Sequence, residues 1–304
     1  MGVDLIAARM LAQGLTKPLA TADDVVRRLV GVQAQDDWIV PYVMRARVAR
    51  RADPQPKDAI VAWLMRGTLH LVAAEDAAWL TRLLGPLFVA KTRPRRLQLG
   101  LTDDVLKREV AKLRQALPGT RAELLSNVDV PEGQARAHLL AYAGLTGVMV
   151  RRGDTFVPMP KGTDVDDPER ELARRYTAGY GPADAKDFAA WSGLPLTTAR
   201  RVMAGSKAGE AKPPRVKLLG HLDPYLLGYK DRTFALDPAH AKKVNRGGGF
   251  LRPFVLVDGR VAGVWSRAWR KDRMVVTVDA WDPVPPKELD AEIADLVDWS
   301  QLRR

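Results

Sequence analysis

Residues Leu29 to Met44 read LVGVQAQDDWIVPYVM, and the interpretation of the chain starts from this stretch. Gln33 and Gln35 stand two residues apart at the end of an apolar run, and an acidic pair follows before a second apolar run. In extended backbone the side chains at i and i+2 point the same way, so the two amides converge just before the next helix. An amide does not titrate near neutral pH, but its oxygen and its two N–H groups can fix a water or a base edge. The alternative is that the pair caps the preceding helix and satisfies loop backbone groups.

The residues around this stretch, 1–100, are predicted to form a first winged helix that carries the glutamine pair on a loop. Thr21 is placed to cap one helix and Asp37 the next. The other predicted elements are helices over 4–13, 57–65 and 75–84 and a strand over 68–72. The run 91–96 is predicted to be a basic loop, either contacting DNA phosphates or simply solvated; its arginines are Arg93, Arg95 and Arg96.

A second winged helix is predicted over 101–160. Amphipathic or short helices are expected at 103–117, 120–125 and 132–145, followed by a hairpin over 148–157. This order of helices and hairpin is typical of a winged helix. The hairpin tip is basic and carries Arg151 and Arg152, which are candidates for DNA contact.

A third winged helix is predicted over 161–210. A helix over 168–180 precedes a helix-turn-helix pattern at 184–203, with a glycine in the turn. Thr198, Arg200 and Arg201 lie early on the second helix of that pattern, where such proteins contact DNA. Helix-turn-helix pairs also serve as plain packing elements, so both interpretations stay open. The polar stretch 205–214 is the clearest boundary in the chain.

The last unit, 211–304, changes to a β pattern. Five short strands are expected at 215–222, 233–236, 250–257, 261–269 and 274–280, with a closing helix over 286–302. They suggest a small barrel or a curled sheet, and the predicted fold class is α+β: three tandem winged helices followed by a C-terminal β-barrel. The turn of the 266–274 hairpin is either a solvated turn or a probe that enters a DNA groove; its candidate DNA contacts are Trp269, Arg270, Lys271 and Arg273.

The charge balance favours a polyanionic partner. The 304 residues carry a formal net charge of +12, which suits binding through counterion release, although a merely soluble basic protein would also have it. The absence of cysteine excludes a disulfide framework, a thiolate metal site and a cysteine nucleophile. The four histidines do not fall at ligand spacing, so neither a metal nor a cofactor is predicted. The sequence has no run long enough for a membrane span and no basic secretory leader, so we expect the cytoplasm.

Four blocks of sequence, in order, resemble the AlkZ-like DNA glycosylases of the HTH_42 superfamily. The blocks are QAQ at 33–35, RGTLHLV at 66–72, DPYLLGYKDR at 223–232 and LRPFVLVDGR at 251–260. The related YcaQ-like branch carries Asp at the second glutamine position. Because this chain has Gln35 there, it is more similar to the AlkZ-like branch.

The resemblance implies removal of an alkylated purine from duplex DNA by hydrolysis of its N-glycosidic bond, with Gln33 and Gln35 as catalytic residues. Alkylation at guanine N7 makes the base a cation and a good leaving group, so no general acid is needed. Two positioned amides then suffice to orient water and stabilise the developing charge. A neutral base would need a carboxylate or another acid–base group. The family includes self-resistance enzymes against N7-alkylating natural products, some of which unhook interstrand crosslinks.

Three more residues are candidates for lining the site: Asp36, Trp38 and His70. Asp36 suits an N-cap as well, and His70 suits a core position. The resemblance also implies that a hairpin of the C-terminal part works against DNA. We expect a nucleoid-associated monomer acting on double-stranded DNA with alkylated purines. The rival classes are a non-catalytic winged-helix regulator and, less favoured, an architectural protein; neither needs a glutamine pair beside a cleft.

Overall fold

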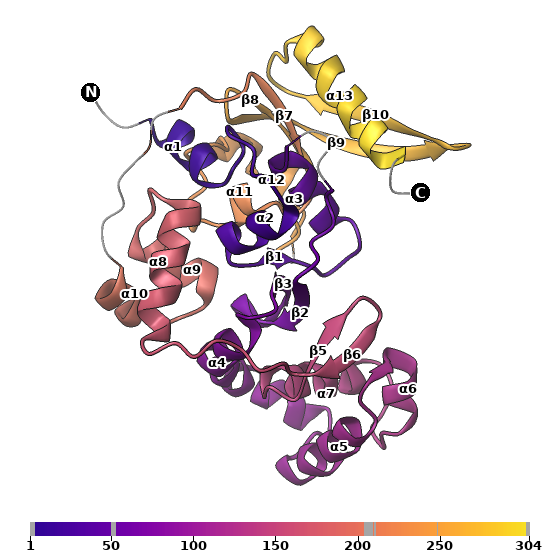
Figure 1. Cartoon of the computed structure of the whole chain (residues 1–304). Coiled ribbons are helices and arrows are strands. Elements are labelled where there is room, and N and C mark those ends of the chain that lie inside the picture. Colours follow the sequence, from indigo (N-terminus) through magenta and orange to yellow (C-terminus); the bar gives the residue numbers. More distant parts are fainter. Residues whose placement is uncertain (1–3, 50–52, 204–208, 210, 248, 302–304) are drawn as a thin grey trace.

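The computed structural model describes residues 4–301 apart from 50–52, 204–208, 210 and 248. Two open antiparallel sheets, surrounded by helices, make up the described fold (Figure 1). No helix in the described part of the chain is both long and apolar enough to cross a membrane.

The two sheets differ in size. The six-stranded sheet has the spatial order β1 (Val32–Gln33), β3 (Leu69–Ala73), β2 (Ala59–Trp63), β5 (Met149–Arg152), β6 (Thr155–Pro158) and β4 (Gly119–Thr120). The four-stranded sheet has the order β10 (Arg273–Ala280), β9 (Arg260–Arg270), β8 (Phe254–Val257) and β7 (Val216–Leu219).

Helices make up most of the remaining described structure. They are α1 (Leu5–Ala12), α2 (Ala22–Leu29), α3 (Ile39–Arg47), α4 (Ala77–Gln98), α5 (Asp103–Gln115), α6 (Arg121–Ser126), α7 (Gln134–Leu145), α8 (Pro168–Tyr180), α9 (Ala185–Ser192), α10 (Leu196–Val202), α11 (Pro224–Leu227), α12 (Ala241–Val244) and α13 (Pro286–Gln301), with 3₁₀ turns η1 (Met65–Gly67) and η2 (Pro238–His240).

The larger sheet joins the two N-terminal units of the chain. Strand β2 pairs with β5 through Val61 and Arg151, so the sheet continues from residues near 60 to residues near 150. Helix α7 packs closely on this junction, since a Cβ on Gly144 would lie 2.2 Å from the Trp63 ring. Only glycine allows that approach. Elements α5, β4, α6, α7, β5 and β6 follow one another in the helix-and-hairpin order expected of 101–160.

The predicted helix over 57–65 is wrong, because these residues form strand β2. The run AIVAW is continuously apolar because β2 is a central strand, flanked by β3 and β5. Periodicity cannot distinguish such a strand from a buried helix segment. The strand predicted over 68–72 is confirmed as β3.

The predicted basic loop over 91–96 is also wrong, because α4 continues through it to Gln98 and contains Pro86 and Pro94. A proline inside a helix costs one backbone hydrogen bond. Arg96 supports the helix at this point: its guanidinium lies 4.9 Å from the Tyr142 ring centroid and donates to Thr92 Oγ1 at 2.5 Å. Packing against α7 therefore extends a helix that the local sequence predicts to end.

The C-terminal sheet is open and does not close into the predicted barrel. Residues 233–236 form turns and a bend rather than a strand, so the second of the five predicted strands is missing. Helix α13 covers the apolar face, with Leu296 and Val297 in one cluster with Val216 and Val255. Because a helix buries that face, closure of the sheet is not needed to remove it from water. The closing helix and the Asp258-Gly259 hairpin turn are confirmed.

The third unit is helical in the part that the structure describes. Helices α9 and α10 meet at Gly193, whose left-handed backbone (φ 85°) ends α9 as the helix-turn-helix pattern predicts. Residues 161–203 contain no strand, so the wing of a third winged helix is not found there. Residues 204–208 and 210, where the polar boundary stretch begins, lie outside the described residues.

A buried ion pair connects the N-terminal part to the DPYLLGY block. Arg47 makes a two-pronged contact with Asp223 at 2.7 and 2.9 Å, and both side chains are fully buried. Asp223 also caps α11 by accepting from the Tyr225 N–H. Tyr225 and Tyr229 donate their hydroxyls to the carbonyls of Gly259 and of a residue in α8. This block is therefore structural, and it holds three distant parts of the chain together.

Candidate active site

Gln33 enters the site from a two-residue strand at the edge of the larger sheet. Helix α2 ends at Val30, whose backbone is left-handed (φ 62°), and the chain then turns into β1. Gln33 pairs with His70 across β1 and β3, and the next N–H, that of Ala34, donates to the Leu69 carbonyl at 2.8 Å. The backbone is therefore extended through the pair, and the two glutamine side chains meet as their spacing predicts.

The two amides are hydrogen-bonded to each other with a defined polarity. Gln33 Nε2 donates to Gln35 Oε1, and Arg66 Nη2 donates to Gln33 Oε1 at 3.2 Å. Because a guanidinium has no acceptor, the amide of Gln33 must turn its oxygen to Arg66 and its nitrogen to Gln35. Gln35 must then turn its oxygen to Gln33. The NH₂ group of Gln35 is left outside this chain of bonds, on an exposed side chain.

Arg66 is itself held in place by the fold. Its Nη1 donates to the Trp191 carbonyl at 2.9 Å, and its backbone is left-handed (φ 58°). That conformation costs a non-glycine residue about 1–2 kcal/mol, so surrounding contacts must maintain it. Burial lowers the pKa of Arg66 and the charge of Arg232 adds to this, while Tyr180 opposes it. Arginine has an ordinary pKa above 12, so Arg66 stays charged at neutral pH.

His70 is a neutral neighbour of the amide pair. Its ring is buried, and its Nδ1 lies 2.9 Å from the Thr68 carbonyl, which can only accept, so Nδ1 carries the proton. Burial lowers the pKa of His70 to about 3, and the charge of Arg66 contributes, while the Thr68 contact opposes the shift. His70 is therefore uncharged at neutral pH and cannot act there as an imidazolium acid.

Asp36 holds the start of α3, which is one of its two expected roles, whereas the cap predicted for Asp37 is not found. Asp36 Oδ1 accepts from the N–H groups of Trp38 (2.8 Å) and Ile39 (3.2 Å), and its Oδ2 contacts His221 Nε2 at 2.6 Å. Burial opposes ionisation of this carboxyl, but the hydrogen bonds from Trp38 and His221 outweigh it and hold the pKa of Asp36 below its usual value. Both carboxylate oxygens are thus occupied by structural partners.

Trp38 contributes a half-buried aromatic surface just after the glutamine pair. Its ring stacks on Tyr42 with centroids 5.8 Å apart, and the Arg267 guanidinium lies 3.3 Å from the Trp38 centroid. Arg267 belongs to β9, so this contact connects the glutamine loop to the C-terminal sheet. A cation over an indole contributes about 0.5–2 kcal/mol, which favours a fixed position of the loop on that sheet.

A narrow crevice lies beside Gln33 and Arg66, where the larger sheet meets α8, α9 and α11. The described residues that line it include no carboxylate and no lysine: Gly31, Gln33, Arg66, His70, Tyr180, Trp191, Leu222, Pro224, Leu227 and Gly228. Burial raises the pKa of Tyr180 well above its usual value, so this phenol also stays neutral. The site can donate and accept hydrogen bonds but offers no general acid that works at neutral pH.

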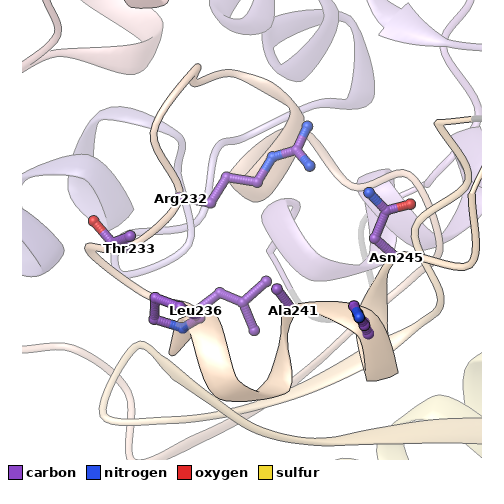
Figure 2. A pocket seen from close by; sticks show the side chains of 7 residues that line it. Arg232, Thr233, Leu236, Ala241 and Asn245 are labelled. Atoms are coloured by element: carbon purple, nitrogen blue, oxygen red, sulfur yellow. The ribbon is translucent and has the colours of Figure 1, made fainter.

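A second and more open hollow of about 280 Å³ lies on the neighbouring 232–245 segment. Arg232 and Asn245 lie across it from Leu236 and Ala241 (Figure 2). The remaining lining residues are Thr233, Pro238 and Lys242, so two cations and no carboxylate border an apolar floor. Arg232 also donates from Nε to the Leu226 carbonyl (2.9 Å) in α11, the helix whose last residue borders the crevice.

The N-terminal DNA-contact candidates are not equally available. Arg96 is buried under Tyr142, so it cannot reach a phosphate and is removed from the set. Arg93 is exposed on α4 but pairs with Asp103 at 3.1 Å. Arg95 is exposed and donates to Gln134, at 2.6 Å for the shorter contact. Surface pairs of this kind are weak and exchange easily for other partners.

The DNA-contact candidates on the second unit and on α10 lie at the surface of the molecule. Arg152 is exposed at the β5–β6 tip, whereas the half-buried Arg151 donates to the Gly153 carbonyl of its own turn at 3.1 Å. On α10, Arg200 is exposed, Arg201 pairs with Glu169, and Thr198 is half-buried. These residues do not meet the glutamine pair.

The C-terminal hairpin is present as predicted. Strands β9 and β10 extend past α13 to a turn at residues 271–272 (Figure 1). Arg270, Lys271 and Arg273 are exposed, and Lys271 is left-handed (φ 55°) in the turn. Trp269 is half-buried and packs against the cluster beneath α13.

Several residues of the site were not singled out by their sequence pattern. Arg66 stands inside a recognised block, but only its fold brings it to Gln33, 33 positions away. His221 and Arg267 reach the glutamine loop from more than 180 positions away. Gly67 was the local signal of an unusual turn, where Arg66 and Gly67 are both left-handed, and the partners from the C-terminal part had no local signal.

Comparison with known proteins gives consistent matches. The family model described as "DNA glycosylase AlkZ-like" matches residues 26–299. A protein of Streptomyces sahachiroi named "Interstrand DNA cross-link repair glycosylase" is 28% identical over 369 aligned residues, covering 97% of this chain and 95% of that protein. The solved structure of Streptomyces sahachiroi DNA glycosylase AlkZ superposes with a TM-score of 0.74 at 26% identity, covering 96% of this chain and 95% of that one. The similarity thus extends over nearly the whole chain and is not limited to one motif.

Proposed function

The chain belongs to the AlkZ-like DNA glycosylase family, and from this premise we propose that it hydrolyses the N-glycosidic bond of cationic N7-alkylated purines at Gln33 and Gln35. It is a monofunctional DNA glycosylase acting in the repair of alkylated or crosslinked DNA, and the alternative of a non-catalytic regulator is not favoured. The finer proposal concerns the adduct and the residues that act on it.

The observation that carries this proposal is a polarised amide pair beside a crevice whose described lining residues include neither a carboxylate nor a lysine. In the reaction the C1′–N9 bond breaks, and its electron pair leaves with the base. A purine already cationic at N7 departs as a neutral molecule, so no proton need be donated to it. The site has none to give, since His70 is neutral and the described lining residues include no carboxylate.

The remaining step is capture of the oxocarbenium-like sugar by water. The water oxygen forms the new bond to C1′, and its extra proton passes to solvent. We assign the Gln35 amide, with its free NH₂ group and the second lone pair of its oxygen, to orienting this water and stabilising the developing charge. Gln33 acts with it by fixing the direction of the Gln35 amide. Fixed dipoles of this kind need no rearrangement during the reaction.

We further propose winged helices over 1–100 and 101–160 and a helix-turn-helix unit over 161–210, whose described residues 161–203 carry no wing, followed by the C-terminal unit 211–304 as an open sheet with its helix. Duplex DNA would contact the exposed cations of these units as an open surface. The proposed contacts are Arg93, Arg95, Arg151, Arg152, Thr198, Arg200, Arg201, Trp269, Arg270, Lys271 and Arg273. The crevice beside Gln33 is too narrow to enclose a bulky base. A bulky or crosslinked adduct would therefore react without being fully extruded from the duplex. We propose a cytoplasmic, nucleoid-associated monomer.

Release of 7-methylguanine from a duplex tests the proposal. Gln35→Ala should slow base release strongly in single-turnover reactions at saturating enzyme, while duplex affinity and thermal stability stay near wild type because the side chain is exposed. Gln33→Ala should also slow release. Gln55→Ala, another exposed glutamine, is the matched control. Full activity of both site variants, measured as free base and alkali-labile breaks, would leave the pair with a capping role only.

A further inference from the structure

Phe250 presents an aromatic ring to solvent at the end of a glycine-containing turn. Three large apolar side chains are exposed among the described residues, and Phe250 is the aromatic one, with an exposed fraction of 43%. The backbone holds it firmly, since the Phe250 N–H donates to the Gly247 carbonyl (3.0 Å) and its carbonyl accepts from the Arg246 N–H (3.1 Å). Gly247 and Gly249 are left-handed (φ 93° and 80°), which the tight turn requires.

Contacts on one face of this ring lead to the glutamine loop. The Phe250 ring stacks on His221, with centroids 5.8 Å apart and planes 29° apart. His221 Nε2 contacts Asp36 Oδ2 at 2.6 Å, and Asp36 immediately follows Gln35 while it caps α3. Two side-chain contacts therefore separate Phe250 from the residue beside the catalytic amide. The ring is fixed relative to that amide although it is exposed.

The chain segment that leads to Phe250 is cationic. Lys242, Lys243 and Arg246 are exposed on the same short segment. Lys242 also borders the open hollow described above. An aromatic ring flanked by cations is the combination with which proteins bind nucleic acids, because the cations meet phosphates and the ring stacks on a base of any sequence.

We infer that Phe250 stacks on a nucleobase beside the lesion and thereby positions the damaged nucleotide against Gln33 and Gln35. This inference rests on the proposed function and adds a DNA contact outside the winged-helix units and the C-terminal hairpin. In this arrangement the base stack opens beside the lesion and the ring occupies the gap. Opening the stack costs free energy, which the new base–aromatic contact offsets. Phe250 touches no reacting atom and is a positioning residue. The alternative is that the exposed ring contacts a second copy of the chain.

The expected effect follows from the energy of base stacking. Loss of one base–aromatic contact weakens binding by roughly 5- to 150-fold, equal to about 1–3 kcal/mol at 1.4 kcal/mol per factor of ten. The contact is uncharged, so Phe250→Ala should weaken duplex binding without changing the slope of log affinity against log salt. Removal of a phosphate contact would lower that slope instead. The slope thus separates stacking from a general loss of electrostatic binding.

The experiment compares Phe250→Ala, Phe250→Trp and Leu97→Ala on a duplex containing 7-methylguanine. Leu97 is a matched control because it is 41% exposed and lies on α4, outside the site. We expect Phe250→Ala to bind 5- to 150-fold more weakly with an unchanged salt slope and melting temperature, Phe250→Trp to bind like wild type, and Leu97→Ala to be unaffected. A neighbouring 2-aminopurine should lose its protein-dependent fluorescence change in Phe250→Ala alone.

Three outcomes overturn the inference. They are wild-type affinity and base release by Phe250→Ala, a loss that Phe250→Trp does not restore, and an oligomeric wild type that Phe250→Ala makes monomeric with DNA binding intact. Gln35→Ala, run beside these variants, keeps the two proposals apart. If Gln35→Ala loses base release while Phe250→Ala does not, the proposed function stands without this contact. If neither loses it, the catalytic assignment of Gln35 fails as well.

Discussion

Replacement of Arg66 by methionine should slow base release by removing the group that sets the direction of both amides. Arg66 Nη2 donates to Gln33 Oε1 (3.2 Å), and Nη1 donates to the Trp191 carbonyl (2.9 Å). Methionine keeps an unbranched apolar stem that ends near the position of Arg66 Nε, and it offers no donor. Without the guanidinium, Gln33 is free to turn over, and Gln35 then turns its oxygen rather than its nitrogen outward.

The magnitude follows from the bonds that are lost. A hydrogen bond to a charged group is worth about 1.5–3 kcal/mol, so if it is fully expressed in the transition state the rate falls roughly 10- to 150-fold. Stability also falls, because Gln33 Oε1 and the Trp191 carbonyl lose their donor, at about 1–3 kcal/mol for each acceptor that remains dry. The left-handed backbone at Arg66 gives no compensation, since methionine is no easier to place there.

Single-turnover release of 7-methylguanine at saturating enzyme, measured below the melting temperature of the variant, is the assay. Arg66→Lys should recover part of the rate, since one ammonium keeps a donor for Gln33 but does not bridge to Trp191. Gln33→Glu is a second probe of polarity: its carboxylate satisfies Arg66 but has no donor, so Gln35 should turn its NH₂ group inward. A folded Arg66→Met variant that releases base at the wild-type rate would refute the assignment of Arg66 to positioning.

Three further predictions concern binding and stability. Binding to undamaged duplex should be weak and fall steeply with salt, because phosphate contacts dominate it; a log–log slope near zero in titrations would contradict a DNA-facing basic surface. Joint replacement of Arg270, Lys271 and Arg273 by alanine should weaken binding and base release together and lower the salt slope by about one unit per contact, with the melting temperature nearly unchanged because all three are exposed; a full slope with normal release would make the hairpin a solubilising turn. The pKa of His70 is about 3 in the folded protein and about 6.5 when unfolded, so only the unfolded state binds this proton between those values. The stability that comes from keeping His70 neutral is therefore complete above pH 6.5 and is lost as the pH falls towards 3, by at most about 1.4 kcal/mol per pH unit. In urea unfolding, the free energy of unfolding of His70→Gln should depend less steeply on pH in that window than that of the wild type. Equal pH dependences would count against a buried neutral imidazole.

Features set by near neighbours in the sequence were predictable. Thr21 caps α2 with a capping box, and the Asp258-Gly259 turn joins β8 to β9, both as expected. The meeting of Gln33 and Gln35 belongs to the same class, because it needs only two residues of extended backbone. The four ordered blocks, which are short runs of adjacent residues, likewise indicated the AlkZ-like family from the amino-acid sequence alone.

Features set by packing were predicted wrongly or not at all. Strand β2 resembled a helix because it is buried among neighbouring strands, and α4 passes through a proline because Arg96 packs on Tyr142. The barrel was expected from strand content alone, but α13 buries the face that closure would have buried. Local propensity carries no information about which distant element covers an apolar surface.

The sequence by itself determined that two neutral amides converge on one point, and it indicated the AlkZ-like family of the chain that carries them. Only the tertiary structure decided which way the amides point, because that direction comes from Arg66, which arrives from η1. Tertiary contacts likewise brought His221 to Asp36 and Phe250 to His221. The physical reason is that hydrogen-bond polarity and ring stacking depend on partners that the chain brings together only after loop closure, and no local pattern encodes that meeting.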